Sequence, residues 1–251
     1  MARNYFIFLP DGGGYVESRK LGIHIPELPP IQRPSERVER IIVPGRSGTL
    51  TKTQGENVYD SYTKSFDIIA TDFEKIQSIN SLLRGTGKII FSNEPQYRYT
   101  VSINDGWDFN RTFRQWRRAT ILMETFPFKE SVEEKVNIGT FVEKTIYGDF
   151  GCEVTINCKT DIPCPFYAEF FGSGVQMVFL NGIKRITSVN AAEDNWKYLD
   201  NEHGVFYNEN GVNMLPWTTG YDFPLYLQSG ENVLLVRKAN SLKVTHRGWF
   251  L

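Results

Sequence analysis

The sequence predicts a mainly β protein with two sandwich or jelly-roll domains and a single helix. Three observations support this fold class. Aromatic residues make up 14% of the 251 residues, beside 21 glycines and 12 prolines, which is typical of short strands joined by tight turns. Only one segment has clear helical periodicity. Strand-like segments recur along the rest of the chain without helices between them, as in sandwiches and jelly rolls.

The N-terminal part begins with predicted strands separated by glycine and proline clusters. Turn-forming residues at 10–14 and at 44–48 divide these segments, because Gly and Pro adopt backbone conformations that interrupt a strand. The predicted strands before the helix are residues 5–9, 21–25, 38–43 and 62–70.

A helix is predicted over residues 72–84. Thr71 and Glu74 have the spacing of a capping box, in which each side chain bonds the backbone N–H of the other. Gly85 follows as a left-handed stop. The apolar stripe that must pack on a sheet or on another subunit consists of Phe73, Ile76, Ile79, Leu82 and Leu83.

After the helix the chain returns to strands, at 88–91 and at 120–126, the latter ending at Pro127. The mixed charges of residues 129–145 indicate a domain junction, which gives domains of 1–135 and 136–251. Residues 1–130 hold 18 Lys and Arg against 15 Asp and Glu, a net charge of +3, whereas residues 131–251 hold 10 against 14, a net charge of −4. The two parts therefore differ in surface charge.

The C-terminal part is predicted to be β throughout. Asn181-Gly182, between apolar stretches, is the strongest hairpin signal in the chain. Further turns are expected at 208–211 and 230–232, before closing strands at 233–236 and 242–245.

Composition excludes several classes of protein. A formal net charge of −1 argues against recruitment to nucleic acid or membrane by bulk charge, and no apolar run is long enough to span a bilayer. Pro10 and Asp11 cut the first apolar segment short, so no signal peptide is expected. The three cysteines, Cys152, Cys158 and Cys164, are an odd number without a CxxC pair, which favours buried free thiols over a zinc site.

Two sequence motifs partly match known binding sites. Gly85-Thr86-Gly87-Lys88 lacks the first glycine and the Ser/Thr of a phosphate loop, and it precedes a strand, so a helix end and a turn explain it. The basic cluster 111–118 interleaves arginines with aromatic residues, as single-strand nucleic-acid sites do. On a strand, Arg114, Trp116 and Arg118 would share one face, and we favour pairing with acidic groups of a neighbouring subunit.

No catalytic signature is present. The sequence has no GxSxG motif and no histidine at a known local spacing from a Ser or Cys nucleophile. We therefore expect neither an enzyme nor a cofactor or metal site. Trp196 and Trp217 fall in predicted loops of the C-terminal domain, where they could stack on sugar rings. Packing in the core or in an assembly interface is the favoured interpretation.

The order of segments resembles the distal tail protein (Dit) family of long-tailed, non-contractile bacteriophages and prophages. The similarity runs through Arg40–Leu50, Phe66-Asp67-Ile68, Leu82–Gly85, Gly87–Phe91, Asn93-Glu94-Pro95 and Phe126-Pro127-Phe128. Near the C-terminus, Asp222–Leu225 and Ser229–Val233 resemble the family's closing segment. The similarity therefore covers nearly the whole chain in the right order.

This resemblance implies a structural virion protein of the tail tip or baseplate. Dit proteins form hexameric rings that join the tail tube to the tail-associated lysin or tip protein. Their N-terminal domains build the ring with a β-sandwich, one helix and a protruding β-hairpin, and their C-terminal domains are galectin-like sandwiches that dock receptor-binding or baseplate proteins. Assembly in the host cytoplasm is implied, with DNA only as cargo passing through the ring.

For this chain the resemblance places the candidate ring contacts at Pro44, Gly45 and Arg46 in the 44–48 turn, on the helix 72–84, and at Arg114 and Arg118. The alternative function is a carbohydrate-binding sandwich that contacts host cell-wall glycans through Trp196 and Trp217.

Overall fold

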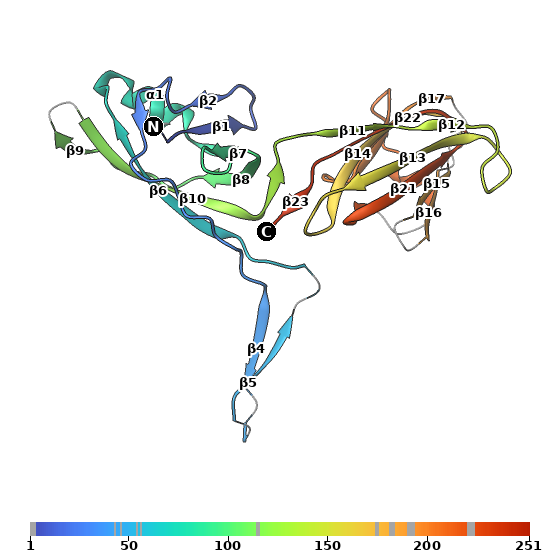
Figure 1. Cartoon of the computed structure of the whole chain (residues 1–251), viewed down its shortest axis with the longest axis horizontal. Helices are drawn as coiled ribbons and strands as arrows, with labels where there is room; N and C mark the ends of the chain where they lie inside the picture. Colours follow the sequence, from blue (N-terminus) through green and yellow to red (C-terminus); the bar gives the residue numbers. More distant parts are fainter. Residues whose placement is uncertain are drawn as a thin grey trace. The chain divides into compact units, whose positions relative to one another are not determined.

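The computed structural model describes residues 4–251 apart from 43, 46, 54, 56, 114–115, 174–175, 181–183, 190–193 and 220–223. The chain divides into two compact units, residues 1–132 with Leu251 and residues 133–250 (Figure 1). Strands dominate both units, and α1 is the one α-helix among the described residues. The mainly β fold class predicted from the sequence is confirmed.

The elements of the first unit are β1 (Phe6–Pro10), β2 (Val16–Glu17), β3 (Ile23–His24), β4 (Val38–Ile42), β5 (Thr49–Thr53), β6 (Tyr62–Ala70), the 3-10 turn η1 (Phe73–Lys75), α1 (Ile76–Leu82), β7 (Gly85–Phe91), β8 (Tyr97–Ile103), β9 (Asn110–Phe113) and β10 (Trp116–Ser131). Those of the second unit are β11 (Lys135–Ile138), β12 (Thr140–Val142), β13 (Gly151–Cys158), β14 (Cys164–Gly172), β15 (Gln176–Leu180), β16 (Lys184–Val189), β17 (Asn195–Asp200), β18 (Val205–Asn208), the 3-10 turn η2 (Leu215–Trp217), β19 (Thr218–Thr219), β20 (Tyr226–Leu227), β21 (Gly230–Arg237), β22 (Ala239–His246) and β23 (Trp249–Phe250).

The first unit is built on an antiparallel sheet in the order β2-β1-β7-β8-β10-β6-β3, with β9 added to β10. Alternate residues of each strand point into one core, as the period of two requires. On β6 these are Phe66, Ile68 and Ala70, the three residues that the sequence pattern predicts. The helix closes this core with Ile79 and Leu83, both almost fully buried.

The helix differs from its prediction in length and in its cap. A 3-10 turn precedes the α-helix, which ends at Leu82 rather than at residue 84. The Thr71 hydroxyl donates to the Gly22 carbonyl at 2.8 Å, and Asp72 Oδ1 accepts from the Glu74 N–H at 3.1 Å. The predicted capping box is therefore wrong, because the Thr71 side chain bonds the segment before β3 instead. Asp72 bonds the start of the 3-10 turn, and α1 itself has no side-chain cap.

The strand predicted to end at Pro127 continues to Ser131. β10 pairs with β6 up to Thr125, and its pairing with β8 shifts register between Thr125 and Lys129. A proline lacks the N–H that a regular ladder needs, but a bulge removes that requirement. Pro127 therefore bends the strand instead of ending it.

Glu130 is a buried carboxylate of the first unit that is paired with two cations. Glu130, on β10, is 5% exposed and accepts from Lys88 and from Arg98, with Arg98 Nε at 2.8 Å. Burial alone would raise the pKa of Glu130, but the two cations outweigh it and hold that pKa below its ordinary value. Removing one member of such a group leaves the others uncompensated, which costs more than the pair gains.

The second unit is a β-sandwich. One sheet has the order β11-β22-β14-β17-β18 with β20 beside β14, and the other has the order β12-β13-β21-β15-β16-β19. Their facing residues form one core, and Cys152, Cys158 and Cys164 all lie in it as buried free thiols, which confirms that expectation. Within the described residues, no three His, Cys, Asp or Glu side chains gather in a way that could hold a metal ion.

The predicted hairpin at Asn181-Gly182 is confirmed by its strands, since β15 and β16 pair antiparallel with Leu180 opposite Lys184. The turn residues themselves lie outside the described residues. Gly172 of β14 packs against the turn between β21 and β22, where an added Cβ would lie 2.1 Å from the Lys238 carbonyl oxygen. Among the described residues, no helix has the length and apolar character needed to cross a membrane.

Candidate assembly interface

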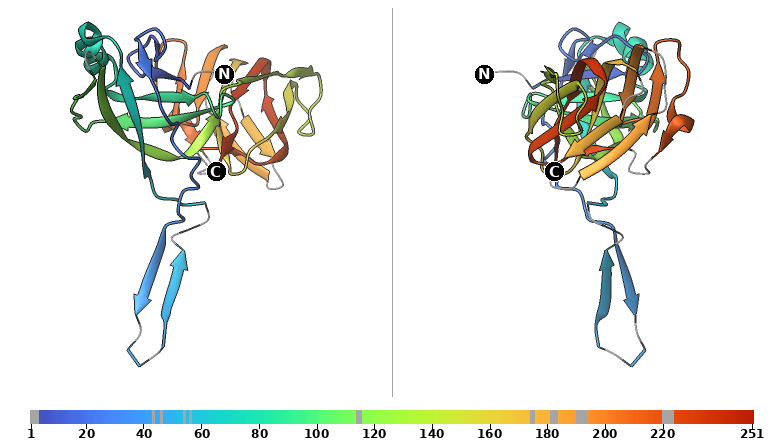
Figure 2. Two further views of the ribbon diagram at one scale, coloured as in Figure 1. Left: turned by 60° about the vertical axis from the view of Figure 1, so that its left-hand side comes forward. Right: turned by 90° about the vertical axis from the view of Figure 1, so that its right-hand side faces the viewer.

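The β4–β5 hairpin is the most exposed element of the first unit. Its strands pair only with each other in the described part of the chain, from Val38 opposite Thr53 to Ile42 opposite Thr49, and the hairpin extends away from the sheet of its unit (Figures 1 and 2). Gly45 and Gly48 have φ values of +81° and +82°, which L-residues rarely adopt, so the turn depends on glycine.

Apolar side chains on this hairpin face solvent. Ile42 is 78% exposed, and the cross-strand neighbours Ile41 and Leu50 are 39% and 40% exposed. Glu39 lies directly opposite Lys52 on the same face as Ile41 and Leu50. An isolated two-stranded hairpin is only marginally stable in water, and exposed apolar groups together mark contact surfaces. The hairpin therefore has the character of an element that is completed by a partner.

The base of the hairpin is anchored to its own unit. The Arg37 N–H donates to the Val58 carbonyl at 2.9 Å, Arg37 Nε donates to Asp60 at 2.6 Å, and the Tyr59 ring packs edge-on against Phe128 of β10 with centroids 5.5 Å apart. These contacts fix where the hairpin leaves the sheet.

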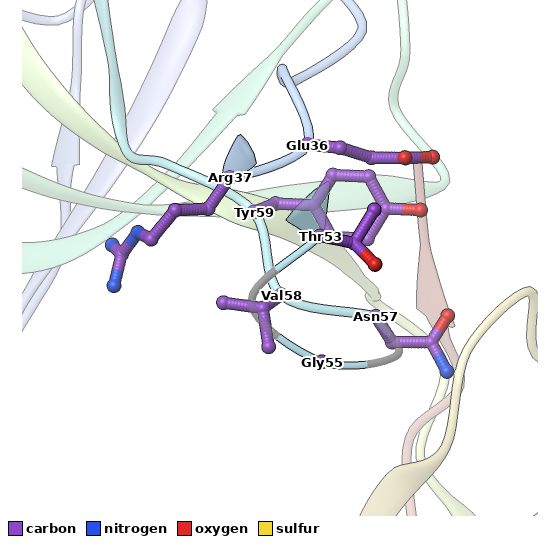
Figure 3. Close-up of a pocket in the computed structure, with 7 residues that line it drawn as sticks. All are labelled: Glu36, Arg37, Thr53, Gly55, Asn57, Val58 and Tyr59. Atoms are coloured by element: carbon purple, nitrogen blue, oxygen red, sulfur yellow. The ribbon is translucent and has the colours of Figure 1, made fainter. Parts of the chain in front are cut away.

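A hollow of about 320 Å³ lies at this base. Figure 3 shows the Glu36 carboxylate and the Tyr59 hydroxyl pointing to one side and Arg37 to the other. The remaining lining residues are Thr53, Gly55, Asn57 and Val58. The carboxylate, the phenol, the guanidinium and the amide make this hollow a polar recess.

A second group of exposed apolar side chains lies on the outer face of β10, between the exposed polar residues Arg118, Thr120 and Glu124. Trp116, Leu122 and Phe126 are 47%, 41% and 43% exposed and alternate with the core residues of the same strand. The sequence pattern gave little warning of this surface, because both faces of the segment carry apolar residues. The sequence predicts a contact face with Trp116 and Arg118, but its continuation through Leu122 and Phe126 was not predicted.

Arg118 lies on this same face and is engaged within its own chain. Its guanidinium binds Asp67 of β6, and the Thr120 hydroxyl donates to the same carboxylate at 2.6 Å. Hydrogen bonds from Arg118 and then from Thr120 lower the pKa of Asp67. The Arg118 side chain remains 55% exposed, so it can contribute charge to a contact surface only together with Asp67.

The basic cluster 111–118 is not a single strand, contrary to the sequence-based expectation. β9 and β10 form a hairpin in which Arg111 lies opposite Arg117 and Asn110 opposite Arg118. Arg114 is outside the described residues. The arginines are therefore divided between two strands and do not line one continuous face.

Almost the whole chain matches the fold of a solved structure. This structure is the SPP1 Dit protein, which is described as a paradigm of the hub adsorption apparatus in phages that infect Gram-positive bacteria. The match has a TM-score of 0.66 and 16% sequence identity, and it covers 98% of this chain and 99% of the SPP1 protein. The chain has the Dit fold. No protein-family model and no curated protein matches the sequence.

In this Dit fold, Pro44 and Gly45 are exposed near the tip of the hairpin, whereas Arg46 lies outside the described residues. The predicted ring contacts of the turn and of Arg118 therefore come from separate elements, the β4–β5 hairpin and β10. The helix offers less than expected, because Ile79 and Leu83 are used in the core and Leu82 is its one apolar residue known to be exposed, at 41%.

An aromatic surface covers the solvent side of the β14–β17–β18 sheet in the second unit. Trp196 is half-buried, with its ring centroid 5.6 Å from that of Phe171 in an edge contact. Tyr198 stacks on Tyr207 at 5.2 Å. Because each ring packs on a neighbouring ring, these side chains cover one another and stabilise the sheet face. The side chain of Trp217 is not among those described.

Proposed function

We propose that this protein is a Dit-type structural component of a phage tail tip, which forms a hexameric ring between the tail tube and the tip protein and docks host-adsorption proteins. The observation that carries the proposal is the match over 98% of the chain to one protein, the SPP1 Dit protein, with both units included. A match to one domain alone would have been compatible with many unrelated functions.

The exposed surfaces of the first unit support a ring. A closed ring repeats one heterologous contact, so each subunit needs two different complementary surfaces. The first unit has two separate groups of exposed apolar side chains: Ile42 with its neighbours on the β4–β5 hairpin, and Trp116, Leu122 and Phe126 on the outer face of β10. In the proposed ring the hairpin of one subunit contacts the β10 face, or an adjoining strand, of the next.

Mass measurement tests this proposal. A hexamer has a mass of about 173 kDa, six times the chain mass of 28.9 kDa. We expect that mass by light scattering at micromolar concentration and six-fold rings in negative-stain images. Particles that remain monomeric across the accessible concentration range, both alone and with the tail-tube protein present, would refute the ring.

A further inference from the structure

Two cysteines of the second unit face each other across a short loop. Cys158 ends β13 and Cys164 begins β14, and the two strands belong to the two different sheets of the sandwich. Their sulfur atoms are 3.4 Å apart, and the residues are 3% and 0% exposed. A disulfide bond is about 2.05 Å long, so the sulfurs need to approach by little more than 1 Å to bond.

The surroundings favour a thiolate at Cys158. Hydrogen bonds from the Cys164 thiol and then from His246 hold the pKa of Cys158 below its ordinary value in spite of burial. The pKa of Cys164 is raised instead, by its hydrogen bond to Cys158 and by burial. His246 is 5% exposed, and its Nδ1 lies 3.4 Å from the Asn137 amide, which leaves the other ring nitrogen for Cys158. A thiolate beside an imidazole is the reactive form of cysteine.

The loop between the cysteines is fixed in position. The Thr160 hydroxyl donates to the Trp249 carbonyl at 2.8 Å and accepts from the Trp249 N–H at 3.0 Å. The Asp161 N–H also donates to the Trp249 carbonyl, at 2.8 Å. The two thiols are therefore held in register by the strand that follows His246.

The third cysteine provides an internal comparison. Cys152 is equally buried, but its thiol donates to the Ala239 carbonyl at 3.4 Å, and burial raises its pKa. It lies six residues before Cys158 on β13, so both side chains enter the same core. Because Cys152 and Cys158 are equally buried but have different partners, comparing them shows how the neighbouring thiol and imidazole change the reactivity of Cys158.

We propose that Cys158 and Cys164 form an oxidisable dithiol, which a hydroperoxide converts into a disulfide that links the two sheets of the sandwich. In the first step the Cys158 thiolate attacks one peroxide oxygen; the S–O bond forms, the O–O bond breaks, and the departing hydroxide takes a proton and leaves as water. In the second step the Cys164 sulfur attacks the sulfenic acid; the S–S bond forms, the S–O bond breaks, and the hydroxide leaves as water with the Cys164 proton. Two thiols and hydrogen peroxide thus give a disulfide and two water molecules.

The bond would stabilise the second unit. It closes a short loop and restricts the unfolded chain, which gives an expected rise in Tm of roughly 5–10 °C for a domain of this size. If the proposed function holds, the particle moves from a reducing cytoplasm to an oxidising medium when the host lyses. The chemistry of the pair does not depend on that function, so a failed ring and a failed disulfide are separate results.

Peptide mapping tests the proposal directly. The folded protein is treated with hydrogen peroxide, its remaining thiols are alkylated in denaturant, and trypsin then cleaves after Lys159, between the two cysteines. We expect peptide 145–159 linked to peptide 160–184, with Cys152 alkylated. The same treatment in urea should lose this selectivity. Three alkylated cysteines, or a link through Cys152, would overturn the proposal.

Single substitutions identify the reacting sulfur. In Cys164→Ser the sulfenic acid should accumulate at Cys158 and be trapped by dimedone, whereas Cys158→Ser should abolish the linkage and leave Cys164 unoxidised. Cys152→Ser is the matched control and should give the linkage at the wild-type rate. Dimedone labelling at Cys164 in the Cys158→Ser variant, at the rate seen for Cys158, would show that oxidation does not need the Cys158 thiolate and would refute the role of the pair.

Discussion

Replacing Ile42 by serine gives the sharpest test of the proposed ring. Ile42 is 78% exposed in the isolated chain, so its loss should change the free energy of unfolding by no more than about 0.5 kcal/mol. In the ring, burying an isoleucine side chain fully is worth about 1.5–3 kcal/mol. With 78% of the side chain still exposed, the gain available at each contact is about 1.2–2.3 kcal/mol.

This gain sets the size of the expected effect. Each subunit contact would weaken by about 8- to 50-fold, since 1.36 kcal/mol is tenfold. Because a closed ring repeats the contact six times, the concentration at the midpoint of assembly should rise roughly 10- to 100-fold. Mass photometry or sedimentation velocity over a dilution series measures that midpoint.

Ile138→Ser is the matched control, since Ile138 is also a strand isoleucine and is 77% exposed, but in the second unit. Its assembly midpoint should equal that of the wild type. An unchanged midpoint for Ile42→Ser, or an equal shift in both variants, would refute the assignment of the hairpin to the ring contact.

Three further predictions concern single side chains. Glu130→Gln should lower the free energy of unfolding of the first unit by about 3 kcal/mol, measured in urea at pH 7. Because folding lowers the pKa of Glu130, its stabilising effect is complete above the unfolded-state pKa and is lost as the pH falls through the folded-state pKa. The difference between wild type and variant should therefore shrink in acid, and a constant difference would contradict this. Gly172→Ala should lower the free energy of unfolding of the second unit by about 3 kcal/mol or prevent its folding, because the added Cβ would lie 2.1 Å from a backbone carbonyl oxygen. Gly106→Ala, whose added Cβ would have no atom within 4 Å, should leave the thermal unfolding temperature unchanged. Trp196→Ala should lower stability by roughly 1–2 kcal/mol through the lost ring contact without changing a glycan-array profile; sugar binding by the wild type that the variant lacks would favour the carbohydrate-binding alternative.

The sequence predicted the elements whose signals are local. β6 has the predicted bounds, because alternation along Tyr62–Ala70 directly matches a strand with one buried face. The prediction failed where a distant partner decides the outcome. Thr71 has the right neighbours for a capping box but bonds the Gly22 carbonyl instead, and Pro127 is accommodated by a register shift set by β8.

The candidate site divides in the same way. Proline and glycine at 44–48 predicted an exposed turn, and Pro44 and Gly45 are exposed. The partner of Arg118 could not be predicted, since Asp67 lies 51 residues away in the chain and is adjacent only because β6 pairs with β10. His246 is 88 residues from Cys158 in the chain, yet the pairing of β22 with β14 brings it to that thiol. Spacing carries no information about contacts that sheet topology creates.

The β4–β5 hairpin has a consequence for the life of the free subunit. Because its strands pair only with each other in the described residues, each has an outer edge whose backbone N–H and C=O groups are available to any other extended chain. Such edges template unwanted aggregation, and charged side chains are a common protection against it. Arg40 on β4 and Lys52 on β5 are both exposed and provide that protection. The edge that could bind a partner therefore also makes the unassembled subunit prone to aggregate at high concentration. Correct assembly would cover this edge and keep the protein in solution.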